Sequence, residues 1–487
     1  MPSRDNWKVP FSGLSEPGLV TDLYELTMAQ TYFQHGMSSR ATFSLFIRSY
    51  PPNRGYFVAA GLEDVLRYLE EWRFPEESID YLVSTRMFHG DFLEYLSGVR
   101  FTGDVWAMPE GRVFFSDEPV LEVSGPVVEA QAVESYVINQ VNLQTMMATK
   151  ASRCVRAGQG RPIVDFSLRR TQGVDAAMKV ARCSYIAGFQ ATSNVMAGKA
   201  YGMPLAGTMA HSFVSSYEHE VDAFRAYAES FPDRAILLID TYDTVAGARN
   251  AALVGNEMKA RGRALDGVRL DSGDLESLSR EVRAVLDDAE LPDVRIVASG
   301  GLDELDVDNL VGRGAPIDAF GVGTKMGVSA DAPWTDMAYK LVQYGCRPVL
   351  KLSTGKVSVP GEKQVFRLRD AAGSLAGDVI ALRDEDEPSA GAEGLPPEPL
   401  LRKVMQGGRT MEEAPGLDEA RELLCRDLEA LDDGVMALRD PAVYPVHLSP
   451  RLDRLRVDME VSLAAESADR VAAGGTPGPV CEARPCE

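Results

Sequence analysis

The chain has 487 residues, of which 45% are hydrophobic and 25% charged, and its formal net charge is −22 at pH 7. This length suits two or three domains and is enough to bury a core without disulfide or metal staples. The strong negative charge argues against nucleic acid and anionic membranes as partners, so a site for an anion must carry its own positive groups.

Residues 1 to 130 predict an N-terminal α+β domain. Helical patterns cover 63–72 and 75–96, and strand patterns with Gly/Pro turns cover 41–47 and 111–123. Residues 1–17 lack the apolar core of a signal peptide, and no apolar run approaches the ~20 residues that cross a bilayer. We therefore expect a cytoplasmic protein.

The six cysteines are scattered and form no CxxC pair. We expect free thiols in a reducing compartment, although Cys481 and Cys486 could pair in the tail.

Residues 131 to 345 predict a catalytic α/β barrel. Apolar runs at 234–240, 267–270, 294–298 and 317–320 alternate with helical patterns at 244–262, 275–286 and 303–312. Such alternation is typical of parallel strands joined by right-handed crossovers. A doubly wound open sheet fits the pattern as well, but polar residues follow strand after strand, which favours the converging loops of a (β/α) barrel.

The C-terminal part predicts a return to the first domain. Strand patterns reappear at 349–382, so we assign 346–450 to a segment that rejoins the N-terminal domain. The acidic, Pro- and Gly-rich stretch 384–399 predicts a mobile excursion. For 451–487 we expect a C-terminal helix followed by a disordered tail.

Carboxylates follow two of the predicted strands. Asp240 ends one strand, and Asp271 and Asp274 follow the next around Ser272-Gly273. Mg²⁺ commonly takes one or two carboxylates together with phosphate oxygens and water, so Asp271 and Asp274 are candidate metal ligands. The alternative is that each Asp caps the following helix.

Glycine turns follow the other two predicted strands, as Ser299-Gly300-Gly301 and Gly321-Val322-Gly323-Thr324. Without a Cβ atom the backbone can approach a phosphate closely and present N–H groups to it. Either turn alone could be a plain tight turn, whereas two in succession favour phosphate binding.

Positive groups and one histidine complete the candidate site. We interpret Arg169-Arg170 and Arg269 as buried guanidinium groups, which are costly to bury unless an anion or an internal carboxylate meets them. The segment 207–213 contains Thr208 and His211. The next histidine, His219, lies eight residues on, which is not a zinc-ligand spacing.

Between residues 21 and 367 the motifs together resemble those of nicotinate phosphoribosyltransferases. They are the segments 21–28 (TDLYELTM), 165–173 (DFSLRRTQG), 207–213 (GTMAHSF), 269–275 (RLDSGDL) and 321–324 (GVGT), with Tyr339-Lys340-Leu341 and Pro360-Gly361. The resemblance implies an irregular (β/α) barrel of the type II phosphoribosyltransferase kind, with an α+β domain formed by the N-terminal part and the returning C-terminal segment.

The resemblance also implies a reaction. Nicotinate, phosphoribosyl pyrophosphate, ATP and water would give nicotinate mononucleotide, pyrophosphate, ADP and phosphate, which is the entry step of NAD salvage. His211 matches the histidine that ATP phosphorylates transiently, and the family is typically a homodimer with shared sites. Positions that match nicotinate contacts are Tyr24, Thr208, Arg269 and Thr324.

Combined with the residue analysis, this assigns three groups of residues. The catalytic residues are His211, Arg269 and Asp271. The residues expected to bind phosphoribosyl pyrophosphate are Arg169, Arg170, Asp240, Ser299, Gly300, Gly301, Gly321, Gly323 and Thr324. Mg²⁺, on Asp271 and Asp274, is the expected cofactor, with ATP as co-substrate.

Three alternatives stay open. A related phosphoribosyltransferase could use nicotinamide or quinolinate instead. A barrel aldolase or isomerase acting on a sugar phosphate would need a Schiff-base lysine or a base at a strand end; Lys325 follows a strand end, but its Gly-Thr setting favours phosphate binding. The chain could also be a non-catalytic paralogue.

Overall fold

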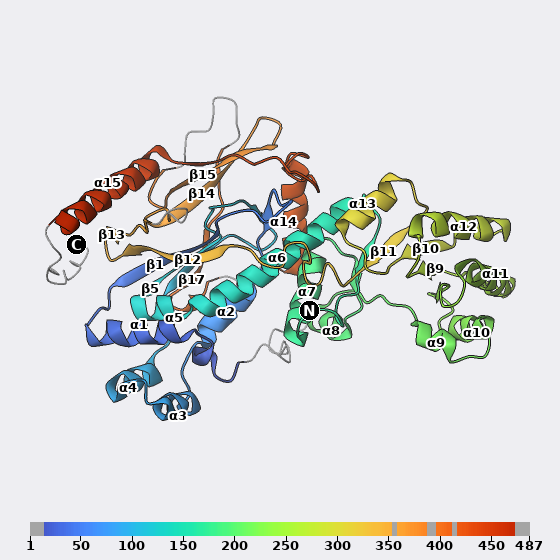
Figure 1. The fold of residues 1–487 in the computed structure, drawn as a ribbon, viewed down its shortest axis with the longest axis horizontal. Helices are drawn as coiled ribbons and strands as arrows, with labels where there is room; N and C mark the ends of the chain where they lie inside the picture. Colours follow the sequence, from blue (N-terminus) through green and yellow to red (C-terminus); the bar gives the residue numbers. More distant parts are fainter. Residues whose placement is uncertain (1–13, 353–357, 387–395, 412–415, 473–487) are drawn as a thin grey trace. The chain divides into compact units, whose positions relative to one another are not determined.

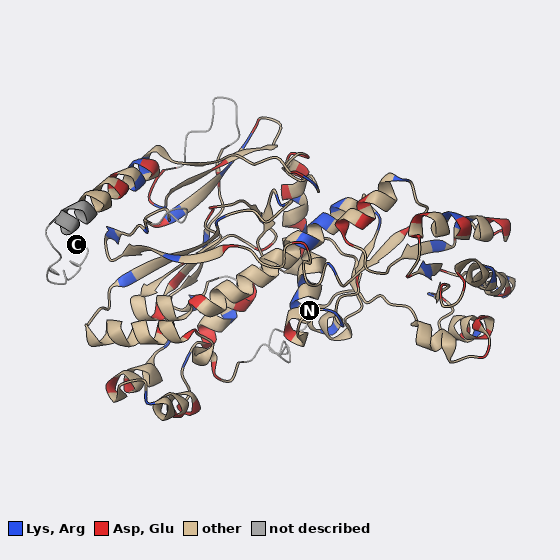
Figure 2. Ribbon diagram, viewed as in Figure 1, with Lys and Arg blue, Asp and Glu red and all other residues tan. Residues whose placement is uncertain are grey.

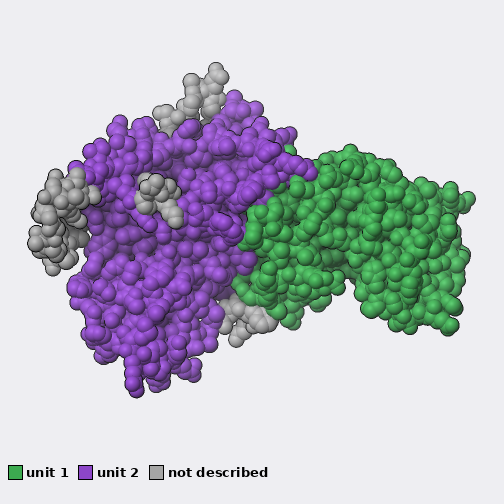
Figure 3. All heavy atoms as spheres, viewed as in Figure 1, with its two compact units in different colours: residues 1–8, 147–333 green, residues 9–146, 334–487 purple. Residues whose placement is uncertain are grey.

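The computed structural model describes residues 14–352, 358–386, 396–411 and 416–472. The chain forms two compact units (Figure 3): unit 1 comprises Met1–Lys8 and Met147–Pro333, and unit 2 comprises Val9–Met146 and Trp334–Glu487. Most of the predicted excursion at 384–399 and the tail beyond 472 lie outside the described residues, as do Cys481 and Cys486.

Unit 1 is built on a six-stranded parallel sheet with the strand order β7-β6-β11-β10-β9-β8. Its strands are β6 (Ile163–Asp165), β7 (Ala191–Thr192), β8 (Ile236–Leu238), β9 (Gly267–Leu270), β10 (Arg295–Ala298) and β11 (Ala319–Val322). The parallel, mixed α/β arrangement is confirmed. The sheet curls, but among the described residues its edge strands β7 and β8 do not pair, so it is a half-barrel rather than a closed barrel.

Helices connect these strands as the alternating pattern predicts (Figure 1). They are α7 (Val174–Ile186), α8 (Val195–Tyr201), α9 (His211–Ser215), α10 (Glu220–Ser230), α11 (Thr244–Ala260), α12 (Leu275–Asp288) and α13 (Glu304–Gly312). On α12 the buried positions Leu275, Val282 and Leu286 recur at helical spacing, because this face covers the sheet while the other faces water.

Unit 2 combines strands from both ends of the chain in a seven-stranded sheet, ordered β13-β12-β1-β5-β3-β17-β18. The strands are β1 (Arg40–Ile47), β3 (Asp104–Ala107), β5 (Leu121–Pro126), β12 (Met337–Tyr344), β13 (Arg347–Pro348), β17 (Arg402–Gln406) and β18 (Arg409–Thr410). Because β12 pairs with β1, the C-terminal strands join the sheet of the N-terminal strands from Met337 onward.

The smaller sheets of unit 2 use further C-terminal segments. A four-stranded sheet contains β14 (Lys363–Arg369), β15 (Leu375–Leu382), β16 (Glu398–Pro399) and β19 (Val446–Leu448), and a two-stranded one contains β2 (Phe57–Val58) and β4 (Val113–Phe114). The helices are α1 (Leu23–Gln34), α2 (Leu62–Glu71), α3 (Glu76–Thr85), α4 (Gly90–Gly98), α5 (Val127–Ala132), α6 (Glu134–Gly158), which runs on into unit 1, α14 (Leu417–Ala430) and α15 (Pro450–Ala472).

One predicted helix and one predicted strand are each divided. The helical pattern at 75–96 forms α3 and α4, because Arg86 adopts a left-handed conformation (φ 57°) that ends α3. The strand pattern at 111–123 forms β4 and the start of β5, with a turn at Asp117 (φ 68°) between them.

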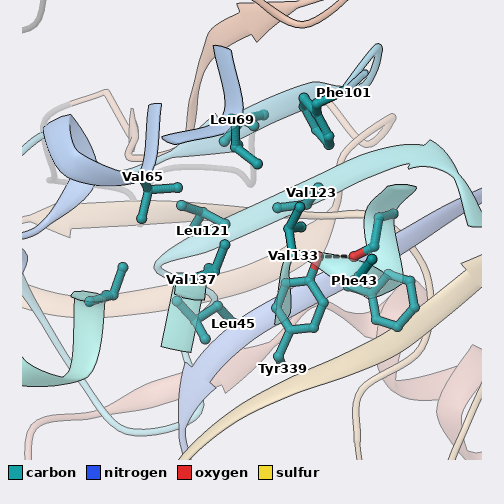
Figure 4. Close-up of a cluster of buried hydrophobic side chains, with 14 of the residues drawn as sticks. Phe43, Leu45, Val65, Leu69, Phe101, Leu121, Val123, Val133, Val137 and Tyr339 are labelled. Carbon is teal, nitrogen blue, oxygen red and sulfur yellow. Dashed lines mark hydrogen bonds between the residues drawn. The ribbon is translucent and has the colours of Figure 1, made fainter. Parts of the chain in front are cut away.

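The core of unit 2 lies on one face of the seven-stranded sheet (Figure 4). Phe43 and Leu45 on β1 belong to this core and alternate with Thr42 and Ser44, which are also buried, because both faces of β1 are covered. The ring of Tyr339 on β12 stacks on Phe43 with centroids 4.9 Å apart, and its hydroxyl donates a hydrogen bond to the carbonyl of Ala130 at 2.6 Å. This core therefore joins N-terminal and C-terminal strands.

Acidic and basic residues are interspersed along the helices of both units, as on α12 and α15 (Figure 2). Among the described helices none is long and apolar enough to cross a bilayer.

Cys154 and Cys425 are free, but Cys346 is disulfide-bonded, so the prediction of free thiols is wrong at this position. Cys346 lies exposed in the turn between β12 and β13.

Candidate active site

The candidate residues of unit 1 gather at one edge of its parallel sheet. Because the strands run parallel, their carboxyl ends meet at the same edge, where the loops of open α/β sheets bind ligands. The candidates that follow the strands directly are Asp240 after β8, Asp271 after β9, Ser299 after β10 and Gly323 after β11. The strand-end pattern in the sequence therefore predicted this grouping.

Arg269 on β9 is the most enclosed cation of the group, with a side chain 12% exposed. Its Nη1 donates to the hydroxyl of Thr208, its Nη2 lies 3.7 Å from Oδ1 of Asp271, and its Cζ lies 5.9 Å from the ring centroid of Phe166. Its Nε is buried without a hydrogen-bond partner. A guanidinium held this way has donor capacity left for an anion.

The surroundings of Arg269 also affect its pKa. Burial lowers the pKa of the guanidinium, whereas the charges of Asp271 and Asp240 oppose that shift and the charge of Arg169 adds to it. An arriving carboxylate would offset this desolvation.

His211 is the first residue of α9. Its Nδ1 lies 3.2 Å from the hydroxyl oxygen of Thr241, and its Nε2 lies 3.8 Å from Oδ2 of Asp271. The side chain is 44% exposed, so the ring is oriented on both sides and still accessible to a substrate. Thr241 was not among the predicted site residues, although it directly follows Asp240, which was.

Hydrogen bonds link the loops after β8, β9 and β10. Oδ2 of Asp240 accepts from the amide of Asp271 at 3.0 Å and from the hydroxyl of Ser272 at 2.5 Å. The hydroxyl of Ser299 donates to Oδ1 of Asp271 at 2.5 Å. The other oxygen of Asp240, Oδ1, is buried without a hydrogen-bond partner. The two carboxylates thus hold the loops together and leave one oxygen for a further ligand.

Asp274 has a different environment. Its side chain caps α12 by accepting from the amides of Glu276 at 3.2 Å and Ser277 at 3.4 Å. The described residues contain no group of three or more His, Cys, Asp or Glu side chains arranged to hold a metal ion. That arrangement is not required for Mg²⁺, which usually keeps several waters and binds substrate phosphates.

The glycine turns are constrained by packing. A Cβ atom on Gly300 (φ 100°) would lie 2.0 Å from the carbonyl oxygen of Asp271. On Gly321 it would lie 2.4 Å from the ring of Phe166, and on Gly323 it would lie 2.5 Å from the carbonyl oxygen of Phe166. Gly301 (φ 73°) has no such neighbour within 4 Å. Three of these glycines are therefore needed for close approach of the loops, and Gly301 is open to a ligand.

Arg169 and Arg170 are exposed in the turn after β6, so the expectation of a buried arginine pair is wrong. The turn begins where Asp165, which is buried, accepts from the amide of Ser167 at 2.8 Å, and it carries the following residues out into solvent. Thr324 is exposed as well.

Tyr24, the remaining candidate, belongs to unit 2. It lies in the first turn of α1 and is 47% exposed. Partial burial raises the pKa of its hydroxyl, and the nearby carboxylates of Glu134 and Glu25 add to the shift. Its contact with nicotinate stays a prediction.

Known protein families match nearly the whole described chain. The N-terminal domain of nicotinate phosphoribosyltransferase matches residues 19–142, the nicotinate phosphoribosyltransferase family matches 162–345, and the C-terminal domain matches 396–456. A nicotinate phosphoribosyltransferase of Mycobacterium tuberculosis is 48% identical over 440 residues, which cover 89% of this chain and 92% of the relative. That of Bacillus subtilis is 41% identical and covers 75% and 76%.

Solved structures agree with these sequence matches. Human nicotinic acid phosphoribosyltransferase superposes with a TM-score of 0.80 at 31% identity and covers 90% of this chain and 99% of that one. A nicotinate-nucleotide pyrophosphorylase from Pyrococcus furiosus gives a TM-score of 0.70 at 25% identity, with 88% and 97% covered. With the strand-end site in place, these matches show that the chain belongs to the nicotinate phosphoribosyltransferase family.

Proposed function

We propose that this protein transfers the phosphoribosyl group of phosphoribosyl pyrophosphate to nicotinate, giving nicotinate mononucleotide and pyrophosphate. The observation that carries the proposal is Arg269, an enclosed guanidinium that bonds Thr208 and has an unpartnered Nε at the carboxyl edge of the sheet. The planar guanidinium group can donate two parallel N–H hydrogen bonds, which suits the carboxylate that distinguishes nicotinate from nicotinamide.

The reaction needs positioning more than a strong base. The pyridine nitrogen is itself the nucleophile, and the anomeric carbon passes through an oxocarbenium-like state as pyrophosphate leaves. The protein must hold the ring in line with that carbon and neutralise the leaving group. Arg169 and Arg170 are exposed, so they can meet the pyrophosphate as it arrives from solvent. The open backbone of Gly301 and the hydroxyl of Thr324 would hold phosphate oxygens.

The carboxylates at the sheet edge fit Mg²⁺. The unpartnered Oδ1 of Asp240 and the carboxylate of Asp271 would supply the one or two protein oxygens that this ion usually takes. Bound there with the substrate, Mg²⁺ would neutralise charge on the pyrophosphate. Asp274, which caps α12, would act through water.

We further propose that ATP phosphorylates His211 transiently and that this step drives the transfer forward. The ring is exposed and oriented by Thr241 and Asp271, which supports this role. The same proposal includes a homodimer in which Tyr24 serves a partner's site. It also includes a cytoplasmic location.

One assay tests the function. Purified protein is incubated with phosphoribosyl pyrophosphate, Mg²⁺ and one of the three pyridine bases (nicotinate, nicotinamide or quinolinate), with and without ATP. We expect mononucleotide from nicotinate, and more of it with ATP. Preference for nicotinamide or quinolinate would refute the substrate assignment, and equal yields with and without ATP would refute the coupling.

A further inference from the structure

Lys325 joins the two glycine turns of the site. It follows Gly323-Thr324 directly at the end of β11, and its ammonium group lies 3.0 Å from Oδ2 of Asp303 and 2.7 Å from Oδ2 of Asp306. Both aspartates lie at the start of α13, just after the turn Gly300-Gly301. One side chain from the β11 turn is therefore held by two carboxylates at the start of α13, the helix that follows the β10 turn.

A second lysine bridges the same two segments. Lys150 on α6 pairs with Glu304, the first residue of α13, and lies 2.6 Å from Oδ1 of Asp331 in the segment after β11. Arg153 adds a contact of 3.1 Å to Glu304. The side chains of Lys150, Arg153 and Glu304 are each at most 2% exposed. The ion pair between Lys150 and Glu304 is thus buried. The ion pairs of Lys325 lie closer to the surface, because the Lys325 side chain is 40% exposed.

The carboxylates that hold Lys325 also shape the start of α13. Oδ1 of Asp303 accepts from the amides of Leu305 and Asp306, and the amide of Asp303 donates to Oδ2 of Asp306 at 3.1 Å. This reciprocal capping fixes the backbone that leaves Gly301. A displacement of either aspartate would therefore also shift the neighbouring Gly300-Gly301 turn.

We propose that Lys325 is a positioning residue that sets the spacing between the Gly300-Gly301 turn and the Gly323-Thr324 turn, and that it is not itself a phosphate ligand. A phosphate would have to compete with two carboxylates already within 3.0 Å of its ammonium group. The inference rests on the proposed function, in which these turns hold phosphoribosyl pyrophosphate.

The two possible roles of Lys325 predict opposite effects for Asp306→Asn. If Lys325 binds phosphate directly, removing the charge of Asp306 frees the ammonium group and tightens substrate binding. If Lys325 positions the turns, the same change weakens the link and loosens binding. Asparagine keeps an oxygen for the amide of Asp303, so the start of α13 stays capped.

The experiment compares Lys325→Met, Lys325→Arg and Asp306→Asn, with Lys259→Met as a matched control. Lys259 is an exposed lysine at the end of α11 whose ammonium group donates to the carbonyl of Glu290. We measure kcat, KM for phosphoribosyl pyrophosphate and KM for nicotinate, and calorimetric binding of phosphoribosyl pyrophosphate without nicotinate. We expect Lys325→Met and Asp306→Asn to raise KM and Kd for phosphoribosyl pyrophosphate about two- to fivefold, the scale of an exposed ion pair.

In the same variants KM for nicotinate should change less than KM for phosphoribosyl pyrophosphate, because Lys325 and Asp306 do not contact the pair Arg269 and Thr208. Lys325→Arg should restore the wild-type KM, and Lys259→Met should match wild type throughout. Tighter binding in Asp306→Asn, or an unchanged KM in Lys325→Met, would overturn the positioning role while leaving the proposed function intact. A wild-type protein that binds no phosphoribosyl pyrophosphate would overturn both.

Discussion

At the residue scale, we expect the hydrogen-bonded pair Arg269 and Thr208 to determine substrate choice. Arg269→Ala removes an enclosed charge that we expect to meet the nicotinate carboxylate. The loss of transition-state stabilisation should be roughly 2–4 kcal/mol, which is a drop of about 30- to 1000-fold in kcat/KM for nicotinate. Steady-state kinetics would measure it.

Arg269→Lys serves as the control, because it keeps the charge but loses the planar fork, so we expect only partial recovery of kcat/KM. Catalytic efficiency equal to wild type in Arg269→Ala would remove Arg269 from the site.

Thr241 is the second prediction at this scale. Its hydroxyl meets Nδ1 of His211 at 3.2 Å, so Thr241→Val loses the bond that orients the ring. A hydrogen bond of about 1 kcal/mol corresponds to roughly a fivefold slower transfer of label from ATP to the protein. Thr241→Ser should restore the rate. Equal labelling rates in Thr241→Val and wild type would show that the ring is held by other contacts.

The sequence predicted the site residues at the strand ends but not the side chains that contact them. Asp240, Asp271 and Ser299 follow from where predicted strands stop, because all parallel strands end at one edge. The burial assigned to Arg169 and Arg170 was wrong, since the direction of a turn after a strand depends on its tertiary contacts. The contact between Thr241 and His211 joins loops 30 positions apart, which no local pattern encodes.

At the scale of elements, the start of α13 depends on a buried charge. Glu304 is 1% exposed and pairs with Lys150 and Arg153, which are as deeply buried. Glu304→Gln removes the carboxylate that both buried cations share, although Lys150 keeps Asp331, so we expect the free energy of unfolding to fall by about 3 kcal/mol. Urea denaturation would measure the loss.

Glu281→Gln on the exposed face of α12 is the matched control, and we expect a change within about 0.5 kcal/mol. If both variants unfolded at the same urea concentration as wild type, the buried pairing would contribute nothing to stability.

Elements with strong local patterns were predicted closely. The strand expected at 267–270 is β9 (Gly267–Leu270), and the helix expected at 303–312 is α13 (Glu304–Gly312). The helix expected at 75–96 divides at Arg86, which adopts a left-handed backbone conformation. The residue at this position is neither glycine nor proline, so the sequence did not signal the break. Periodicity therefore located the elements, whereas their ends depended on individual backbone conformations.

At the scale of the whole molecule, buried carboxyl groups with raised pKa values predict that the free energy of unfolding falls as pH rises. Burial raises the pKa of Glu25 to about 7, although hydrogen bonds from Thr21 and Ser135 oppose the shift, and burial raises that of Asp117 to about 6. Between the ordinary pKa values, 4.5 for Glu and 3.8 for Asp, and these raised values, the folded protein binds more protons than the unfolded chain. Unfolding should therefore become easier from pH 5 to pH 7.5, and the net charge of −22 acts in the same direction.

Thermal unfolding at pH 5.5 and pH 7.5 tests this sign. Wild type should show the higher Tm at pH 5.5, and Glu25→Gln, which stays neutral at both, should show a smaller difference between them. A higher Tm at pH 7.5 in wild type would contradict the prediction.

The large-scale arrangement was the hardest to foresee. Alternation of strands and helices predicted a parallel sheet in unit 1, but whether such a sheet closes depends on edge strands as short as β7 and β8. The return of the C-terminal strands was expected from their pattern. Their partners were not, because the pairing of β12 with β1 joins residues about 300 positions apart.

That long-range pairing has a consequence for biosynthesis. While the ribosome is still translating, β1 emerges early but lacks its neighbour β12 until almost 300 further residues have been added. Residues 147–333, by contrast, form a continuous stretch that holds its own sheet. Residues 147–333 can therefore fold on the nascent chain while the strands of unit 2 still have unpaired edges. A prematurely terminated product would expose those edges and would be prone to aggregate through them.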